Sequence, residues 1–150
     1  MSKLLAAPPD VIRWVSRSGD HGDCAIAAIA MACGMTYEAT LQVCSIVAPT
    51  VLVDGMRWQE IRSACQRLGH DVKTLHFERI RLDDDETTGI LEVEQTQKGA
   101  QGYRHVVYLW AGRIIEPKVD RQELWEDPEQ FLNHYGYRVG RLLVLTPKED

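Results

Sequence analysis

The spacing of apolar residues along the chain changes near its middle. In the first half, apolar residues recur at intervals of three and four, which is typical of helices with one buried face. We expect three helices there, and a glycine or a proline closes each of them, as is common at helix ends. The expected helices cover about 24–33, 37–47 and 54–68, and they end at Gly34, Pro49 and Gly69.

In the second half, apolar and polar residues alternate, which predicts half-buried β-strands. Two of these strands are joined at Ala111 and Gly112, a two-residue link typical of a β-hairpin. One further helix is expected over about 128–135. Ile80 and Leu82 either continue the first strand or begin another. The expected strands are 72–77, 90–93, 105–110, 113–116 and 137–145.

Helices first and an antiparallel sheet second predict an α+β fold. The stretch from Cys24 to Cys33 is apolar on every face, so none of its sides favours water. We therefore expect a central buried helix there, with the sheet packed against it.

A chain of 150 residues is expected to form a single domain, 1–150, with one hydrophobic core. Its ends are expected to be less ordered, with a flexible arm at 1–10 and a polar tail at 146–150. The acidic run 83–86 and the glycine-containing stretch 98–102 are expected to be loops.

The composition argues against several classes of function. A net charge of −5 gives no electrostatic basis for binding nucleic acid or an anionic membrane surface. No apolar run is long enough to span a bilayer, and the N-terminal apolar patch is too short for a secretion signal. We therefore expect a cytoplasmic protein with reduced thiols. The cysteines form no C-x-x-C pair, so neither a metal nor another cofactor is expected.

Cys24 is the first candidate for chemistry. With Asp23 as the N-cap, it lies in the first turn of the expected helix, where backbone N–H groups lack intrahelical partners. The positive end of the helix dipole favours a thiolate, so the pKa of Cys24 is expected below the ordinary value of about 8.5. The alternative is a small core residue. Core packing is the role expected for Cys33, Cys44 and Cys65.

A thiolate nucleophile needs a base, and His105 is the best candidate. It lies at the start of a strand, beside a glycine-containing loop. If the hairpin has a two-residue turn, His105 and Glu116 share one face as diagonal neighbours, with backbones about 7–8 Å apart. Glu116 then accepts the ring N–H and fixes the tautomer. A one-residue slip moves Glu116 to the other face, and Asp120 or Asp127 takes that role.

The other four histidines are weaker candidates for the base. His21 is close to Cys24 in the sequence but lies on the wrong side of the helix start. No acidic partner can be placed beside His70, His76 or His134 from the sequence, so we interpret these three as structural.

Several segments together resemble the papain-like cysteine peptidases. The stretch 22–31 contains Asp-Cys at the start of an Ala-rich helix, and a Gly and a Tyr-Glu pair follow at 34–38. This arrangement is similar to the nucleophile helix of the bacteriocin-processing, double-glycine leader peptidases and their stand-alone relatives. The segments 54–56, 105–107 and 116–117 resemble that family's next helix, its histidine strand and its later acid-Pro pair. The order of Cys, His and acid along the chain is also the same.

The resemblance implies a papain-like fold with Cys24 as nucleophile, His105 as general base and then acid, and Glu116 as the residue that orients His105. It implies hydrolysis of a peptide, isopeptide or related amide bond through a thioester, with a peptide or protein as substrate.

Two features depart from that family's pattern. The acid here is Glu116, where the family has Asp or Asn, so its longer side chain must fold back to reach the ring. The second departure concerns the oxyanion. The family usually has a Gln about six positions before the Cys, and its side chain donates to the oxyanion. Here Ser18 occupies that place, and no Gln lies upstream of Cys24. Losing such a donor costs about 10²–10³ in rate. Either Ser18, His21 or a backbone N–H substitutes, or the protein is slow or inactive on peptides.

Two alternative functions stay open. The same triad serves acyl transfer in transglutaminase-like or amine acyltransferase enzymes. The missing Gln favours an inactive papain-like protein that binds a protein partner. Such a protein is expected to expose an aromatic patch built from Trp58, Trp110, Trp125 or Tyr135. The chain lacks the transporter segments that accompany leader peptidases, so toxin export is not implied.

Overall fold

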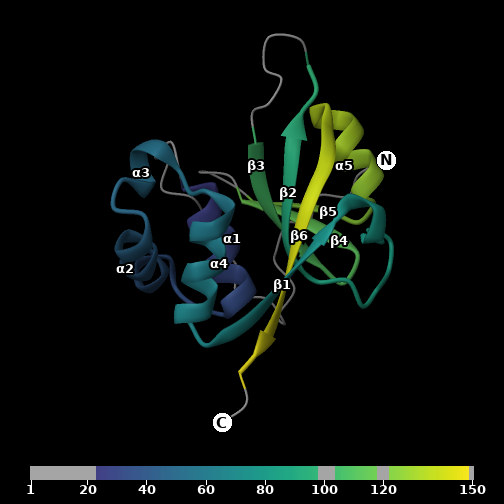
Figure 1. Ribbon diagram of the computed structural model, residues 1–150. Coiled ribbons are helices and arrows are strands. Elements are labelled where there is room, and N and C mark those ends of the chain that lie inside the picture. Colours follow the sequence, from purple (N-terminus) through teal and green to yellow (C-terminus); the bar gives the residue numbers. More distant parts are fainter. Residues whose placement is uncertain (1–22, 98–103, 118–121, 149–150) are drawn as a thin grey trace.

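The structure, a computed structural model, describes residues 23–97, 104–117 and 122–148 (Figure 1). The expected arm at 1–10 and the expected loop at 98–102 lie outside these ranges. The helices are α1 (Cys24–Cys33), α2 (Tyr37–Val47), α3 (Val51–Asp54), α4 (Trp58–Arg67) and α5 (Pro128–Tyr135), with a 3-10 turn at Phe77–Arg79. The strands are β1 (His70–His76), β2 (Gly89–Gln95), β3 (Arg104–Trp110), β4 (Arg113–Pro117), β5 (Gln122–Trp125) and β6 (Tyr137–Pro147).

Within the described residues, six strands form one antiparallel sheet with the order β1-β6-β2-β3-β4-β5. β6 is the last strand of the chain, yet it lies between β1 and β2 (Figure 1). Helices α1 to α4 precede the sheet in the chain and lie together beside it. The expected α+β architecture is therefore confirmed.

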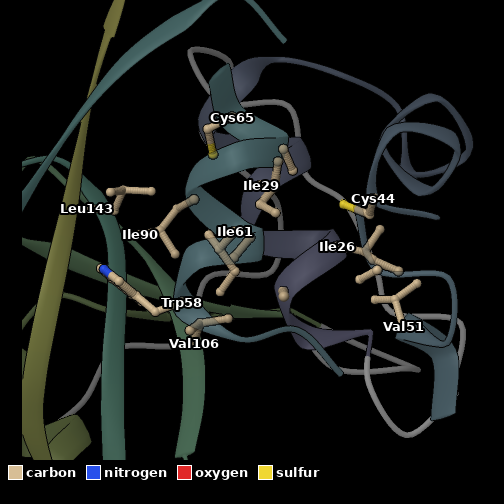
Figure 2. Packing of buried hydrophobic residues seen from close by; sticks show 14 residues of the cluster. Ile26, Ile29, Cys44, Val51, Trp58, Ile61, Cys65, Ile90, Val106 and Leu143 are labelled. Carbon is tan, nitrogen blue, oxygen red and sulfur yellow. The ribbon is translucent and has the colours of Figure 1, made fainter. Parts of the chain in front are cut away.

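The sheet is covered on both faces. On one face, Ile90, Val106 and Leu143 pack with residues of α1 and α4 (Figure 2). On the other face, Val107 belongs to a second core built around Phe131 of α5. Neighbouring residues of β3 thus enter different cores, which explains why this strand has a continuous apolar run instead of an alternating one.

α1 is the centre of the packing. All residues from Ala25 to Met31 are buried, between β3 on one side and α2 and α4 on the other. Ile26 and Ile29 are fully buried, and burying each stabilises the fold by about 1.5–3 kcal/mol. Gly34 ends the helix in the left-handed conformation, with φ of 68°, which glycine adopts without strain from a Cβ. The expected packing of the sheet against this helix is confirmed.

The start of α1 differs from its prediction in one respect. Asp23 occupies the N-cap position, but its side chain makes no capping hydrogen bond, and its φ of −89° and ψ of 3° are not the extended backbone typical of a cap. Asp23 is instead buried, and the hydroxyl of Tyr37 in α2 donates to its Oδ2 at 3.4 Å. Asp23 therefore links α1 to α2.

The third expected helix is divided in two. The short helix α3 comes first, and Gly55 with φ of 75° ends it. α4 begins only at Trp58, because Glu60 accepts a hydrogen bond from the backbone N–H of Arg57 at 2.8 Å and so provides a new helix start. The predicted start at Asp54 was therefore wrong.

Two strands are longer than expected or shifted along the chain. β1 begins at His70 and ends before Phe77, which lies exposed in the 3-10 turn. β6 continues to Pro147, which pairs with His70. The expected polar tail at 146–150 is thus shorter, because its first residues extend the sheet.

Two further predictions concern the segment between β1 and β2 and the strand that follows β4. Ile80 and Leu82 belong to no strand, whereas the acidic run 83–86 is an exposed loop, as predicted. β5 was not predicted at all, since its four residues are too few for a clear alternating pattern.

In the part of the chain that the structure describes, no single helix has the length and apolar composition needed to cross a membrane. The bent pair of α1 and α2, at 116° to each other, passes the same test by length and composition only.

Candidate active site

His105 and Glu116 meet on the hairpin formed by β3 and β4. Trp110 pairs with Arg113, so the link between the strands is the predicted two-residue turn. By this register, His105 and Glu116 are diagonal neighbours on one face of the hairpin, as expected. His105 Nε2 lies 2.9 Å from both carboxylate oxygens of Glu116. Glu116 therefore holds the imidazole ring in one orientation.

This pair is removed from water. The side chains of His105 and Glu116 are 6% and 3% exposed, and Tyr137 of β6 stacks on the imidazole with ring centroids 6.0 Å apart. Burial by itself lowers the pKa of His105. The charge of Glu116, hydrogen bonds with Cys24 and Glu116 and the charge of Cys24 outweigh burial and raise that pKa to about 10. The ring is therefore an imidazolium at neutral pH.

Cys24 reaches the same imidazole from α1. It is the first residue of the helix, is half-buried, and forms a side-chain hydrogen bond with His105. Because Nε2 of the ring is bonded to Glu116, Nδ1 is the nitrogen left for the Cys24 sulfur. The neighbouring imidazolium and the N-terminal end of a helix both favour a thiolate. The fold thus brings a thiol, an imidazole and a carboxylate together from α1, β3 and β4.

A cleft of about 570 Å³ is lined by both Cys24 and His105. One wall comes from the connection between α3 and α4 and from the start of α4, including Met56 and Trp58. Another part of the lining comes from β2, β3 and β6. This volume is within the usual range for a ligand site, about 300–1,000 Å³. Among the described residues, no group of His, Cys, Asp or Glu has an arrangement suited to a metal ion.

The remaining predicted site residues either lie outside the described residues or are placed elsewhere. Ser18 and His21, the expected auxiliary residues, lie outside the described residues, and so does Asp120. Asp127 is the exposed N-cap of α5, where it accepts a hydrogen bond from the backbone N–H of Glu129 at 3.0 Å. Its role is therefore to start α5, not to orient His105.

Cys33, Cys44 and Cys65 pack in the core between α1, α2 and α4, as predicted. Burial, together with the charge of Cys33, raises the pKa of Cys44 to about 12. A side-chain hydrogen bond between Cys33 and Cys65 raises the pKa of Cys65, with burial and charge adding to it. The same bond lowers the pKa of Cys33 against the opposing effect of burial.

Sequence reasoning missed the residues of β2 and β6 that lie near His105. Tyr137 stacks on His105, while Glu92 and Arg141 line the cleft. These residues come together only because β6 is inserted between β1 and β2, and no local pattern indicates that insertion. The one available signal was the pair of glutamates, Glu92 and Glu94, in the mainly apolar strand β2.

A second buried carboxylate, Glu123 of β5, was missed as well. It lies directly opposite Glu116 in the pairing of β4 and β5. The Tyr135 hydroxyl donates to Glu123 at 2.6 Å and the Trp125 indole N–H donates at 3.1 Å. Because β5 was not predicted, nothing in the sequence placed this residue opposite Glu116.

Comparisons with known proteins give structural matches only. No family model matches the chain, and no curated protein matches it. The chain is similar to the peptidase domain of Streptococcus ComA, described as a bifunctional ABC transporter involved in a quorum-sensing pathway. That match has a TM-score of 0.59 and 17% identity, and it covers 89% of this chain and 97% of that one. The peptidase domain of Streptococcus mutans ComA matches with a TM-score of 0.55 and 16% identity, covering 90% of this chain and all of that one.

These matches define the fold. The chain has the papain-like fold of the ComA peptidase domains, with its helices and antiparallel sheet in the corresponding arrangement, and the predicted fold class is confirmed. At 16–17% identity, the likeness shows the fold and not the activity, because one fold hosts many functions.

Proposed function

We propose that this protein is a thiol hydrolase that cleaves a peptide or isopeptide bond with Cys24, His105 and Glu116. One observation carries the proposal: a buried imidazole bonded to a carboxylate through Nε2 also contacts a cysteine at the start of a helix, in a cleft. An activated nucleophile, its base and the group that orients the base form the unit that nucleophilic catalysis requires. The papain-like fold supports the same assignment.

In the first proposed step, the Cys24 thiolate attacks the carbonyl carbon of the scissile amide and forms a C–S bond and an oxyanion. The His105 imidazolium then gives its proton to the leaving nitrogen, and the C–N bond breaks as the oxyanion collapses. An amine leaves, while a thioester on Cys24 and a neutral His105 remain. Because Nε2 is held by Glu116, Nδ1 is the atom that transfers the proton.

In the second step, neutral His105 takes a proton from water as the water attacks the thioester. The C–S bond breaks, the carboxylic acid leaves, and the thiolate and the imidazolium are restored. The charge of Cys24 is one cause of the raised pKa of His105. Forming the thioester removes that charge, so the ring loses its proton more readily when it has to act as a base.

The oxyanion needs hydrogen-bond donors. We infer that backbone N–H groups in the first turn of α1 provide one, since they have no partner four residues earlier in the helix. Ser18 and His21 are the proposed sources of a second donor, in place of the Gln that the family resemblance leads us to expect.

A pool of synthetic peptides tests the proposal without knowledge of the natural substrate. The pool is incubated with the unaltered protein, with Cys24→Ala and with Cys33→Ala, and new peptide ends are identified by mass spectrometry. We expect cleavage by the unaltered protein and by Cys33→Ala, a matched control on the same helix, and none by Cys24→Ala. Cleavage by Cys24→Ala would refute the proposal.

Two further outcomes separate the alternatives. With glycinamide in the mixture, coupled amide products in place of new acids would identify acyl transfer, because the amine then replaces water. The absence of both hydrolysis and coupling would favour an inactive binding protein. Against that alternative, Trp58 and Trp125 are buried and Trp110 and Tyr135 are half-buried, so the expected exposed aromatic patch is not formed.

A further inference from the structure

Three charged side chains meet on the sheet wall of the cleft, beside His105. Arg141 of β6 donates to Glu92 of β2 through Nε at 2.9 Å and Nη2 at 2.8 Å, one bond to each carboxylate oxygen. Arg104 of β3 precedes His105 in the chain, and its Nη1 lies 3.8 Å from Oε2 of the same glutamate. All three side chains line the cleft that contains Cys24.

Glu92 and Arg141 are held in place by their surroundings. The Glu92 side chain is only 9% exposed, and Gly140 leaves room for it: a Cβ at that position would lie 2.7 Å from Glu92 Oε1. The guanidinium of Arg141 lies over the Trp58 ring, 4.6 Å from its centroid, and the indole N–H of Trp58 donates to Thr74 Oγ1 at 3.0 Å. Such fixed groups lose little freedom when a ligand binds.

The balance of charge favours an anionic ligand. Both oxygens of Glu92 are bonded to Arg141, and the charge of this guanidinium offsets the charge of the carboxylate. Two guanidinium groups face one carboxylate, which leaves one positive charge in excess. The Arg104 side chain is 59% exposed and its contact with Glu92 is long, so it is able to turn its N–H groups toward a ligand.

The acidic residues that line the cleft near α3 and α4 already have partners. Glu60 accepts from the backbone N–H of Arg57 at 2.8 Å and forms an ion pair with its side chain at 3.6 Å. Asp54 accepts from the Thr50 hydroxyl at 2.8 Å. The pair of Glu60 with Arg57 is therefore neutral overall, whereas Asp54 keeps its negative charge, so the excess positive charge beside His105 is local to the strands.

We propose that Arg104 and Arg141, organised by Glu92, form a subsite for a carboxylate of the substrate close to the bond that is cleaved. This inference rests on the proposed function, because it assumes that the substrate lies between this subsite and Cys24. Guanidinium groups match the planar geometry of a carboxylate and bind it through paired hydrogen bonds. The substrates are accordingly peptides with an acidic side chain or a free C-terminal carboxylate near the scissile bond.

Four small reactive probes test the subsite and distinguish the two sources of the carboxylate. Iodoacetyl-Gly-Asp-amide carries a side-chain carboxylate and iodoacetyl-Gly-Gly a terminal one, while iodoacetyl-Gly-Asn-amide and iodoacetyl-Gly-Gly-amide are their neutral counterparts. Alkylation of Cys24, in which the sulfur displaces iodide, is followed by peptide mapping at low ionic strength. We expect at least one acidic probe to react about tenfold faster than its neutral counterpart, as suits a hydrogen bond between charged groups.

Two arginine variants locate the effect. Arg104→Gln is expected to bring the ratio of acidic to neutral rates close to one. Arg138→Gln removes the same charge from an exposed pair with Glu94 on the same strands, outside the cleft lining, and is expected to keep the preference. Equal rates for acidic and neutral probes in the unaltered protein would overturn the proposal, and so would a preference that survives Arg104→Gln.

A binding measurement separates failure of this inference from failure of the proposed function. In Cys24→Ala, which cannot be alkylated at that position, acetyl-Gly-Asp-amide is titrated while the guanidinium Nε–H signals of Arg104 and Arg141 are followed by NMR. Saturable shifts with this peptide and not with acetyl-Gly-Asn-amide would support the subsite even if Cys24 proved unreactive. Identical responses to both peptides would refute it, whatever the reactivity of Cys24.

Discussion

The two ends of α1 carry cysteines in contrasting environments. Cys24 at the N-terminal end lines a cleft and contacts a buried imidazolium, whereas Cys33 at the C-terminal end packs in the core and contacts Cys65. Both are half-buried, so exposure does not distinguish them. The helix dipole does, because it favours negative charge at the N-terminal end and disfavours it at the C-terminal end.

Their neighbours differ even more than their positions. A hydrogen bond with Cys65 lowers the pKa of Cys33, but a thiol is a weak donor and brings no positive charge. His105 brings a full charge, held by Glu116, and is able to return the proton during a reaction. Under the proposed function, the comparison teaches that a cysteine becomes a nucleophile through the base and the cleft that the fold brings to it, and not through a lowered pKa alone.

The largest expected effect is the loss of activity when Cys24 is replaced, compared with the small loss when a cysteine of the core is replaced. Cys24→Ala is expected to lower kcat/KM by about 10⁴ or more on any peptide found to be cleaved, with the free energy of unfolding nearly unchanged. Cys65→Ala, at a fully buried position, is expected to cost about 1 kcal/mol of stability while kcat/KM changes less than about threefold. Kinetics and urea unfolding of both variants check this, and a large loss of activity in Cys65→Ala would contradict it.

Glu116→Gln is expected to have the next largest effect. The amide keeps the shape of the side chain but removes the charge that raises the pKa of His105, so we expect kcat/KM to fall by about 10²–10⁴. Glu123→Gln is the matched control, since it alters a similarly buried carboxyl group at the paired position of β5. A similar loss in both variants would mean that buried charge in general, and not the bond to His105, sustains activity.

The dependence of stability on pH gives a smaller effect. The pKa of His105 is raised from an ordinary value of 6.5 to about 10 in the folded protein, so the folded state holds a proton that the unfolded state has lost. This contribution is fully present below pH 6.5 and is lost as the pH rises through about 10. It is on the order of a few kcal/mol.

Two measurements check the pH dependence. The free energy of unfolding is expected to decline between pH 6.5 and 10, and to decline less in Glu116→Gln. Ring nitrogen shifts in NMR spectra are expected to show His105 as an imidazolium at pH 8. A neutral ring at that pH would contradict the ion pair with Glu116.

The smallest effect concerns the C-terminal end of α1. Gly34→Ala is expected to cost about 1 kcal/mol, because φ of 68° is strained for a residue with a Cβ although the space around it is open. Thermal unfolding measures this cost. Labelling of Cys24 is expected to stay unchanged, and a loss of its reactivity would show that the two ends are coupled.

What the sequence could predict follows from how local each signal is. The bounds of α1 and α2 and the turn at Ala111 and Gly112 depend on neighbouring residues, and all were correct. The turn alone fixes which residues share a face, so the contact of His105 with Glu116 was predictable from the sequence. Their catalytic roles, with that of Cys24, stay a prediction.

The missed features are those that depend on distant parts of the chain. Arg141 and Tyr137 reach the site because β6 enters the sheet between β1 and β2, and a sequence pattern contains no record of strand order. The start of α4 was predicted at Asp54 and Gly55. It lies at Trp58 instead, because the Glu60 side chain accepts a hydrogen bond from the backbone N–H of Arg57. Asp23 was misjudged because its partner, Tyr37, lies on another helix.

The relative alkylation rates of Cys24 and Cys33 test the central claim most directly. The folded protein is treated with limiting iodoacetamide at pH 6, and each cysteine is followed by peptide mapping over time. If Cys24 is a thiolate paired with His105, it is expected to react at least about tenfold faster than Cys33, Cys44 and Cys65, because only the thiolate is nucleophilic. Equal rates for all four cysteines, or a faster reaction at Cys33, would contradict the account.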